Sequence, residues 1–110
     1  AAIPRRVIKG RRKGATCLCD HCGRNEGNTQ HEIFNRGLTR EGTEKREACL
    51  SRYVISMLCM PCHEIVQDSP EDNRTLLAFN RSLWGEDVVN NHIRYMRELG
   101  VRVDFQGRDE

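Results

Sequence analysis

The chain has 110 residues, of which 37% are hydrophobic and 31% are charged, so it can build one domain with a small core. A structural metal ion is a common supplement to a core of this size. No apolar run approaches the roughly 18 residues of a membrane span, and the basic N-terminus lacks the apolar segment of a secretory signal. These features exclude an integral membrane protein and favour the cytoplasm, where paired cysteines are metal ligands more often than disulfides.

Residues 1–16 are interpreted as a basic arm. Residues 1–14 carry six cationic side chains and no acidic one, whereas the other 96 residues hold 12 basic and 16 acidic side chains, a net charge of −4. The six cations are Arg5, Arg6, Lys9, Arg11, Arg12 and Lys13. A cationic arm on a weakly acidic body is a common means of holding a phosphate backbone, and such binding is steeply salt-dependent. The alternative is a tail that only keeps the protein soluble.

The first half of the chain predicts short elements joined by loops. Residues 17–24 are expected to form a tight metal-binding turn, and 29–35 a short strand. Residues 36–50 lack hydrophobic periodicity and are expected to form an exposed loop, with at most one helical turn at 43–47. Residues 52–58 are β-branched, aromatic and apolar, which predicts a second strand.

The second half of the chain predicts helices. A short helix is expected from residue 61, and two longer helices follow over 69–84 and 86–99. Ser69 is a good N-cap, apolar residues recur at helical spacing, and a glycine stops each of the longer helices. The tail at 101–105 alternates between apolar and polar residues as an edge strand would.

Two Cys-x-x-Cys pairs stand 36 residues apart, Cys19 with Cys22 and Cys59 with Cys62. Each pair offers two sulfur ligands from one turn, and two such turns complete a tetrahedral zinc site. Because the protein would supply all four ligands, the site is expected to be structural. Cys17 is an alternative ligand, although the two-residue spacing favours Cys19 and Cys22. Two disulfides are the other interpretation, which a reducing cytosol disfavours.

Two histidines are candidates for chemistry beside this zinc site. His31 lies in the segment Gln-His-Glu-Ile-Phe at 30–34, and His63 directly follows Cys62. A neutral imidazole, with a pKa of about 6.5, can take up a proton at working pH. Zinc at Cys62 would fix the backbone of His63, as a precise metal ligand requires. The alternative is a half-exposed strand residue at 31 and a solvated helix residue at 63.

Together these motifs resemble the HNH endonucleases of the ββα-metal superfamily, and the short chain resembles the small HNH proteins encoded by bacteriophages. The resemblance covers about residues 17–68. The matching stretches are Cys19-Asp20-His21-Cys22, Gln30-His31-Glu32-Ile33-Phe34 and Leu58-Cys59-Met60-Pro61-Cys62-His63. The resemblance implies two strands, a loop and a helix that clasp a catalytic divalent ion, which would be Mg²⁺, Mn²⁺ or a similar ion. It also implies metal-dependent hydrolysis of DNA phosphodiesters in the cytoplasm of a bacterial host cell.

By position, the resemblance makes His31 the general base and His63 a ligand of the catalytic ion. The family usually places an acid or a second histidine before the base as a metal ligand, whereas Gln30 stands here and Glu32 follows. Two registers are therefore open. In the first, His31 is the base and Glu32 or Gln30 assists the metal; in the second, His31 binds the metal and Glu32 is the base. We favour the first register. Strand alternation places residues 31 and 32 on opposite faces unless a bulge intervenes.

The family also has an asparagine that ties the loop near the second strand, and it would fall near Tyr53 or Val54. Neither position is asparagine, and Asn35 and Ser51 are the nearby candidates to replace it. Two arginines near the site are candidate phosphate contacts, in addition to those of the arm. They are Arg36 and Arg40.

The sequence therefore predicts one α+β domain. It comprises the basic arm over 1–16, an HNH core over 17–68 held by a four-cysteine zinc site, and a helical extension over 69–110 packed on that core. The expected function is an HNH endonuclease that nicks or cuts double-stranded DNA, alone or with larger phage DNA-processing machinery. Two alternatives remain open: a zinc-ribbon module that binds nucleic acid without cleaving it, and an adaptor that presents its C-terminal helices to a larger machine.

Overall fold

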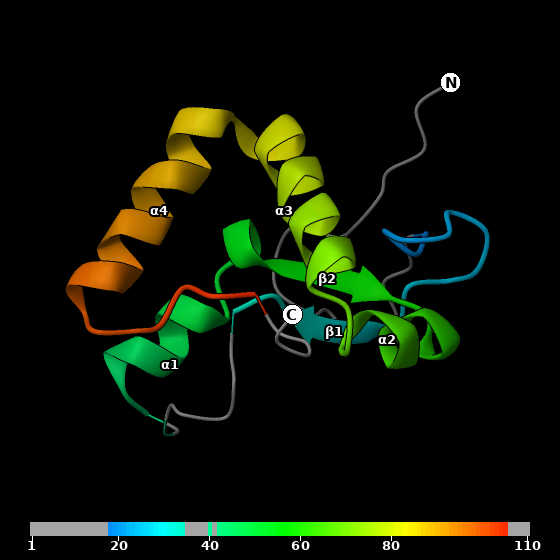
Figure 1. Cartoon of the computed structure of the whole chain (residues 1–110), viewed down its shortest axis with the longest axis horizontal. Coiled ribbons are helices and arrows are strands. Elements are labelled where there is room, and N and C mark those ends of the chain that lie inside the picture. The colour runs from blue at the N-terminus through cyan, green and yellow to red at the C-terminus, as the bar shows by residue number, and fades with distance from the viewer. Residues whose placement is uncertain (1–17, 35–39, 41, 106–110) are drawn as a thin grey trace.

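The computed structural model describes residues 18–34, 40 and 42–105, and it is a mixed α+β structure (Figure 1). In chain order its elements are β1 (Thr29–Glu32), α1 (Glu44–Cys49), the 3-10 turn η1 (Arg52–Val54), β2 (Ile55–Leu58), α2 (Met60–Val66), α3 (Pro70–Trp84) and α4 (Glu86–Glu98). None of these helices has the length and apolar character that crossing a membrane would need. The basic arm, Cys17, Asn35 and Arg36 lie outside the described residues.

The two strands form an antiparallel pair whose register places His31 opposite Ser56. Because side chains alternate along a strand, His31 and Ser56 lie on one face of the sheet and Glu32 lies on the other. The His31 face is covered by α2 and α3, since the His31 ring contacts a residue of each helix. Glu32 reaches α1 instead. The hairpin therefore separates these two neighbouring side chains into different surroundings.

The turn that carries the first cysteine pair is docked on β2. The Asp20 N–H donates to the Met57 carbonyl at 2.9 Å, and the Met57 N–H donates to Asp20 Oδ2 at 3.0 Å. Gly27 allows this close approach, because a Cβ at that position would lie 2.8 Å from the Met57 carbonyl oxygen. Gly23 has a φ of 70°, a conformation that favours glycine, and it lets the chain fold back within the turn.

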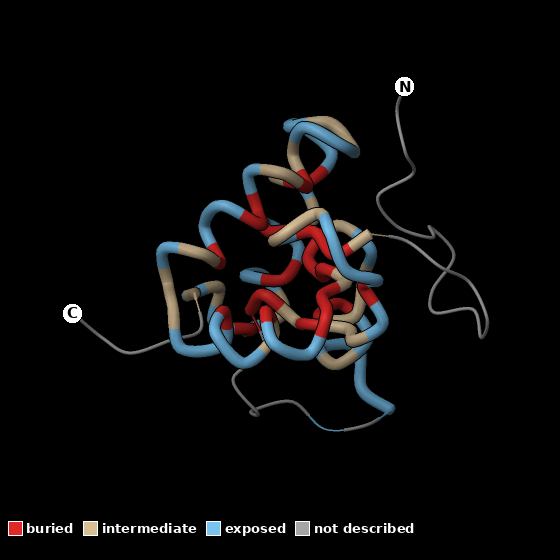
Figure 2. Tube along the Cα trace, turned by 90° about the vertical axis from the view of Figure 1, so that its right-hand side faces the viewer, coloured by how far each residue is buried: buried red, intermediate tan, exposed pale blue. Residues whose placement is uncertain are grey.

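Helices α3 and α4 pack on each other and contribute buried residues to the apolar core. Ser69 Oγ accepts from the Asp72 N–H at 3.1 Å and caps α3, while Gly85, with a φ of 111°, separates α3 from α4. The expected helices over 69–84 and 86–99 are thus present with nearly the predicted bounds. Figure 2 shows the buried residues gathered inside, with exposed turns outside. The buried apolar residues of the two helices are Leu76, Leu77, Val89, Ile93 and Met96.

The expectation of an exposed loop over 36–50 is wrong for its second half, where α1 forms. Thr43 Oγ1 accepts from the Arg46 N–H at 3.2 Å and caps the helix, so the residues expected to make one turn begin a longer element. Ala48 and Cys49 at its end are buried in the core, and α1 packs on α4. Burial of this helix end stabilises α1. The polar residues around it in the sequence did not predict this burial.

The strand expected over 52–58 begins later, at Ile55, because Arg52–Val54 form a 3-10 turn. Ser51 Oγ accepts from the Tyr53 N–H at 3.3 Å and caps this turn. Asn80 of α3 then donates to the Tyr53 and Ile55 carbonyls, at 3.0 Å each. A buried side chain thus satisfies backbone carbonyls where the 3-10 turn leads into β2.

The edge strand expected over 101–105 is also wrong, since this segment of the described chain forms no strand. The Val101 N–H donates to the Met96 carbonyl at 3.0 Å, which ends α4. The Phe105 ring then packs on Phe34, with centroids 5.5 Å apart. The alternating apolar residues attach the tail to the core through side chains.

Asn80 gives a direct test of this packing. We expect Asn80→Ala to lower the free energy of unfolding by about 3 kcal/mol, because two carbonyls lose their donor and a cavity forms. Ser82→Ala, an exposed change on the same helix, should alter it by less than about 0.5 kcal/mol. Urea denaturation of both variants measures the difference. Equal stabilities for the two would contradict the role of Asn80.

Candidate metal centre and histidine pair

The four cysteines of the two Cys-x-x-Cys pairs lie together. The sulfurs of Cys19, Cys22, Cys59 and Cys62 all lie within 4.8 Å of one another. The Sγ atoms of Cys22 and Cys59 are 3.9 Å apart. A tetrahedral zinc ion with Zn–S bonds of about 2.3 Å requires sulfur separations of about 3.8 Å. The predicted ligand set is thus confirmed as a group that can hold one zinc ion, and all four cysteines are free thiols.

Local hydrogen bonds prepare these sulfurs for a metal ion. The backbone N–H groups of Asn25 and Arg24 lower the pKa of Cys22 to about 6. The side-chain amide of Asn25 donates to Cys59 Sγ at 3.5 Å and lowers the pKa of Cys59. Burial raises the pKa of Cys62. Cys22 and Cys59 therefore lose their protons more readily than Cys62, whose proton would be released to solvent when a metal ion binds its sulfur.

Each cysteine pair is carried by a different part of the fold. Cys19 and Cys22 lie on the turn docked against β2, whereas Cys59 follows the last residue of β2 and Cys62 lies in the first turn of α2. The His63 N–H donates to the Cys59 carbonyl at 2.9 Å, which begins the helical hydrogen bonding. A metal ion bound to the four sulfurs would therefore fix the N-terminal turn, the end of β2 and the start of α2 together.

Cys49 does not belong to this group. It is 1% exposed at the end of α1, and burial raises its pKa. It belongs to the segment 36–50, which the sequence predicted to be an exposed loop, whereas the structure places its side chain in the core. A buried thiol with a raised pKa behaves as a small apolar residue and not as a ligand.

Removal of the metal tests the four-sulfur site. We expect one zinc ion per chain in the purified protein, and we expect Cys59→Ser or chelation to unfold the domain. A structural zinc ion contributes about 10–16 kcal/mol, which matches or exceeds the whole stability of most domains. Metal analysis and circular dichroism measure both effects. The control is Cys49→Ser, which should still bind one zinc ion. Full zinc content in Cys59→Ser would contradict the assignment.

The imidazoles of His31 and His63 lie edge to face, with ring centroids 5.3 Å apart and an interplanar angle of 70°. His31 is 2% exposed on β1, and His63 is half-buried in the first half of α2. The two histidines that the sequence singled out are 32 positions apart and come from different elements. The hairpin and the start of α2, which the cysteines tie together, therefore bring both rings to one place.

Burial of His31 lowers the pKa of its imidazole, with a smaller lowering from His63. Hydrogen bonding to Asn73 and the charge of Glu32 act in the opposite direction. A ring with a lowered pKa is neutral at pH 7 and keeps one nitrogen lone pair. Such a nitrogen can accept a proton or bind a divalent ion.

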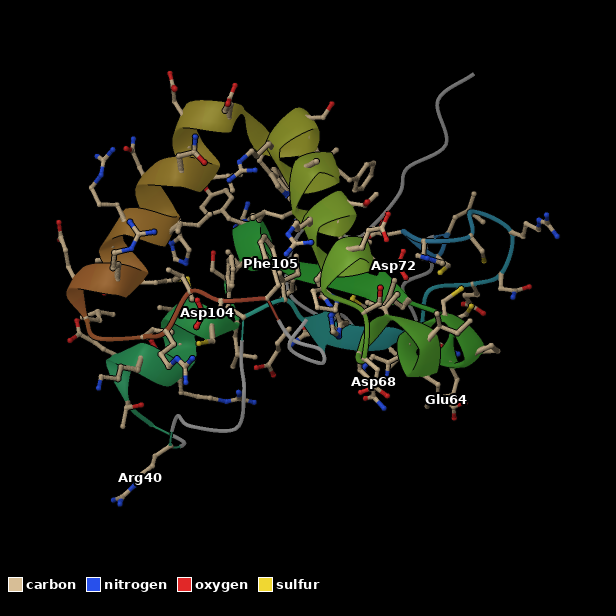
Figure 3. All side chains as sticks on the ribbon, in the orientation of Figure 1. Arg40, Glu64, Asp68, Asp72, Asp104 and Phe105 are labelled. Atoms are coloured by element: carbon tan, nitrogen blue, oxygen red, sulfur yellow. The ribbon has the colours of Figure 1, made fainter. Side chains whose placement is uncertain are left out.

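Glu32 and Gln30 are not placed beside the two imidazoles. The Glu32 carboxylate accepts from Arg46 Nη1 at 2.7 Å, and both side chains are largely buried. Gln30 lies on the same sheet face as Glu32, opposite Met57. Arg40 projects from the end of the molecule that lies opposite to α2 (Figure 3). Within residues 18–34 and 42–105, the four cysteines are the one group of three or more potential ligands placed to share an ion.

Two polar residues beside His31 were missed from the sequence. Asn73 of α3 is fully buried and lies with its Oδ1 atom 2.5 Å from His31 Nε2. Ser56 is also fully buried, directly across the sheet from His31, and its hydroxyl has no hydrogen-bond partner within the described chain. The sequence did hold one signal for them. Each is a polar residue at a position where the apolar pattern of its helix or strand predicts a buried side chain. Figure 3 shows Asp68 and Asp72 where α2 is followed by α3.

Comparison of the chain with models of protein families, with curated proteins and with solved structures found no match.

Proposed function

We propose that this protein is a metal-dependent endonuclease of the HNH type that hydrolyses phosphodiester bonds of double-stranded DNA. The observation that carries the proposal is the convergence of His31 and His63 at 5.3 Å beside a four-sulfur cluster. His31 lies on a strand, and His63 lies on the helix that follows the second strand. The resemblance to HNH endonucleases implies this arrangement. A zinc ion at the sulfurs would keep both elements in place, and the histidines would act at a second divalent ion.

His31 is the proposed general base. Its ring is buried, so it is held in one orientation and remains neutral at working pH. A neutral imidazole takes a proton from the water that attacks phosphorus, and the reaction then breaks the bond to the leaving oxygen. Glu32 is the weaker candidate, because its carboxylate is held by Arg46 on the other face of the sheet.

His63 is the proposed ligand of the catalytic ion. Its imidazole is half-buried and therefore accessible from solvent. Imidazole nitrogen suits ions such as Ni²⁺, whereas Mg²⁺ and Mn²⁺ prefer oxygen ligands beside it. When bound, a divalent ion neutralises the charge that develops on the phosphodiester oxygens. Gln30 and Glu32 lie on the other sheet face, so we expect water and the DNA phosphate to complete the coordination.

DNA would be held by positive side chains outside this site. The basic arm has six cations within residues 1–14, and Arg36 and Arg40 precede α1 in the sequence. These contacts are made to phosphate and carry no base preference, which fits weak sequence selectivity. A larger phage DNA-processing assembly remains the proposed setting for the enzyme.

A plasmid-nicking assay tests the proposed reaction. We expect the zinc-loaded protein to relax supercoiled DNA when Mn²⁺ is added, and to leave the DNA supercoiled when no second divalent ion is added. His31→Ala should lower the rate by about 10²–10⁴-fold, the usual contribution of a general base. His63→Ala should raise the Mn²⁺ concentration required. His92→Asn removes an imidazole elsewhere, on α4, and should cut at close to the wild-type rate.

Two results would overturn this function. The first is undiminished cleavage by His31→Ala, which would exclude the assigned base. The second is a wild-type protein that binds DNA and retains zinc but cleaves with none of Mn²⁺, Mg²⁺ and Ni²⁺. That second result would support the zinc-ribbon binding module instead.

A further inference from the structure

Asn73 connects three parts of the fold through one buried carboxamide. It is 0% exposed near the start of α3. Its Nδ2 atom donates to the Val66 carbonyl at 2.9 Å and to the Ser69 carbonyl at 3.0 Å. Its Oδ1 atom lies 2.5 Å from Nε2 of His31, which is 42 positions away in the chain. The end of α2, the start of α3 and strand β1 therefore meet at this side chain.

The hydrogen-bond partners fix the orientation of the amide. A carboxamide nitrogen has two hydrogens, and carbonyl oxygens accept but cannot donate. The carbonyls of Val66 and Ser69 therefore require the nitrogen of Asn73 on their side. A flipped amide would place its oxygen against two carbonyl oxygens and lose both N–H donations, although each carbonyl also accepts from a backbone N–H. The oxygen of Asn73 must consequently face His31.

The orientation of the amide decides where the His31 proton lies. An amide oxygen has no hydrogen, so it can only accept, and Nε2 of His31 must donate to it. A neutral imidazole carries one N–H, so Nδ1 of His31 is the nitrogen with the lone pair. Histidines that act as bases or ligands are commonly fixed by a partner on the other ring nitrogen in this way.

We propose that Asn73 is a positioning residue that holds His31 in the Nε2–H tautomer and so leaves the lone pair on Nδ1, the ring nitrogen that does not face Asn73. The catalytic consequence rests on the proposed nuclease function, whereas the tautomer does not. Asn73 itself touches neither water nor DNA in the proposed reaction. It acts through His31, in the same way that an acceptor orients the base of other hydrolytic sites.

The competing interpretation is that Asn73 only joins α2 to α3. Its two bonds to the Val66 and Ser69 carbonyls would serve that purpose without any effect on His31. Both interpretations predict a loss of stability when Asn73 is replaced. Stability therefore does not separate them, but the protonation pattern of the His31 ring does.

Nitrogen-15 spectra of the histidine rings in the zinc-loaded protein at pH 8, without a second metal ion, test the proposal. We expect wild-type His31 to carry its proton on Nε2. Asn73→Asp keeps an acceptor opposite Nε2 and should retain this tautomer, while Asn73→Ala should give a mixture of the two. Asn80→Ala removes another fully buried asparagine of α3 that also bonds two carbonyls. It should leave the His31 signals unchanged.

A wild-type His31 protonated on Nδ1 would overturn the proposal, as would an unchanged Nε2–H tautomer in Asn73→Ala. If Asn73→Ala does not fold, the wild-type and Asn73→Asp spectra decide the question, because loss of the Nε2–H form in Asn73→Asp would also overturn it.

Cleavage kinetics provide the second readout. We expect Asn73→Ala to lower kcat by about 10–100-fold with little change in KM for DNA, because only the base is displaced. Asn73→Asp should restore part of kcat. If the wild type does not cleave DNA yet His31 is protonated on Nε2, the nuclease function fails and the positioning role of Asn73 stands. If the wild type cleaves but Asn73→Ala keeps full kcat, the nuclease function stands and the positioning role fails.

Discussion

Four cysteine sulfurs within 4.8 Å of one another are the constraint on which the rest of this small structure depends. They join a turn near the N-terminal end of the described chain to the end of β2 and the first turn of α2. The sheet has only two strands of four residues each, and an isolated hairpin of that size is marginal in water. Ligation of one metal ion by these sulfurs would therefore do what a large apolar core does in longer chains.

Buried asparagines complete the connection between the hairpin and the helices. Asn80 satisfies backbone carbonyls where β2 begins, and Asn73 satisfies those at the α2–α3 junction and reaches His31. Both lie on the buried face of α3 and are fully enclosed. Polar side chains in a core are tolerated when every group is paired, and they then specify one arrangement of the elements. The buried hydrophobic residues of α3 and α4 contribute to the free energy of folding. The two asparagine amides specify how α3 is placed against the strands and α2.

The separation of His31 from Glu32 illustrates how the fold sorts adjacent residues. Alternation along β1 turns one side chain toward α2 and α3 and the other toward Arg46 of α1. The His31 ring is thereby buried and neutral, and the carboxylate is neutralised by a guanidinium. Chemistry that needs a free lone pair is available on the His31 face, which also has the fully buried hydroxyl of Ser56.

Local signals in the sequence predicted the cysteine site and the two long helices, whereas contacts between distant residues decided what it missed. The spacing of Cys59 and Cys62 alone orients their sulfurs, and the Ser69 cap and Gly85 set the ends of α3. No local pattern indicates that Asn80 would bond the carbonyls of residues 53 and 55 and displace the start of β2. The same holds for Asn73, whose partner His31 is 42 positions away.

Anomalous diffraction from crystals of the zinc-loaded protein grown with Mn²⁺ would test the proposed arrangement of two metal ions most directly. Data collected at the two metal absorption edges distinguish zinc from manganese. The expected result is a zinc peak enclosed by the sulfurs of the four cysteines and a separate manganese peak beside the imidazoles of His31 and His63. Zinc at the imidazoles, or disulfides in place of the four thiolates, would contradict the proposed structural and catalytic roles of the two sites.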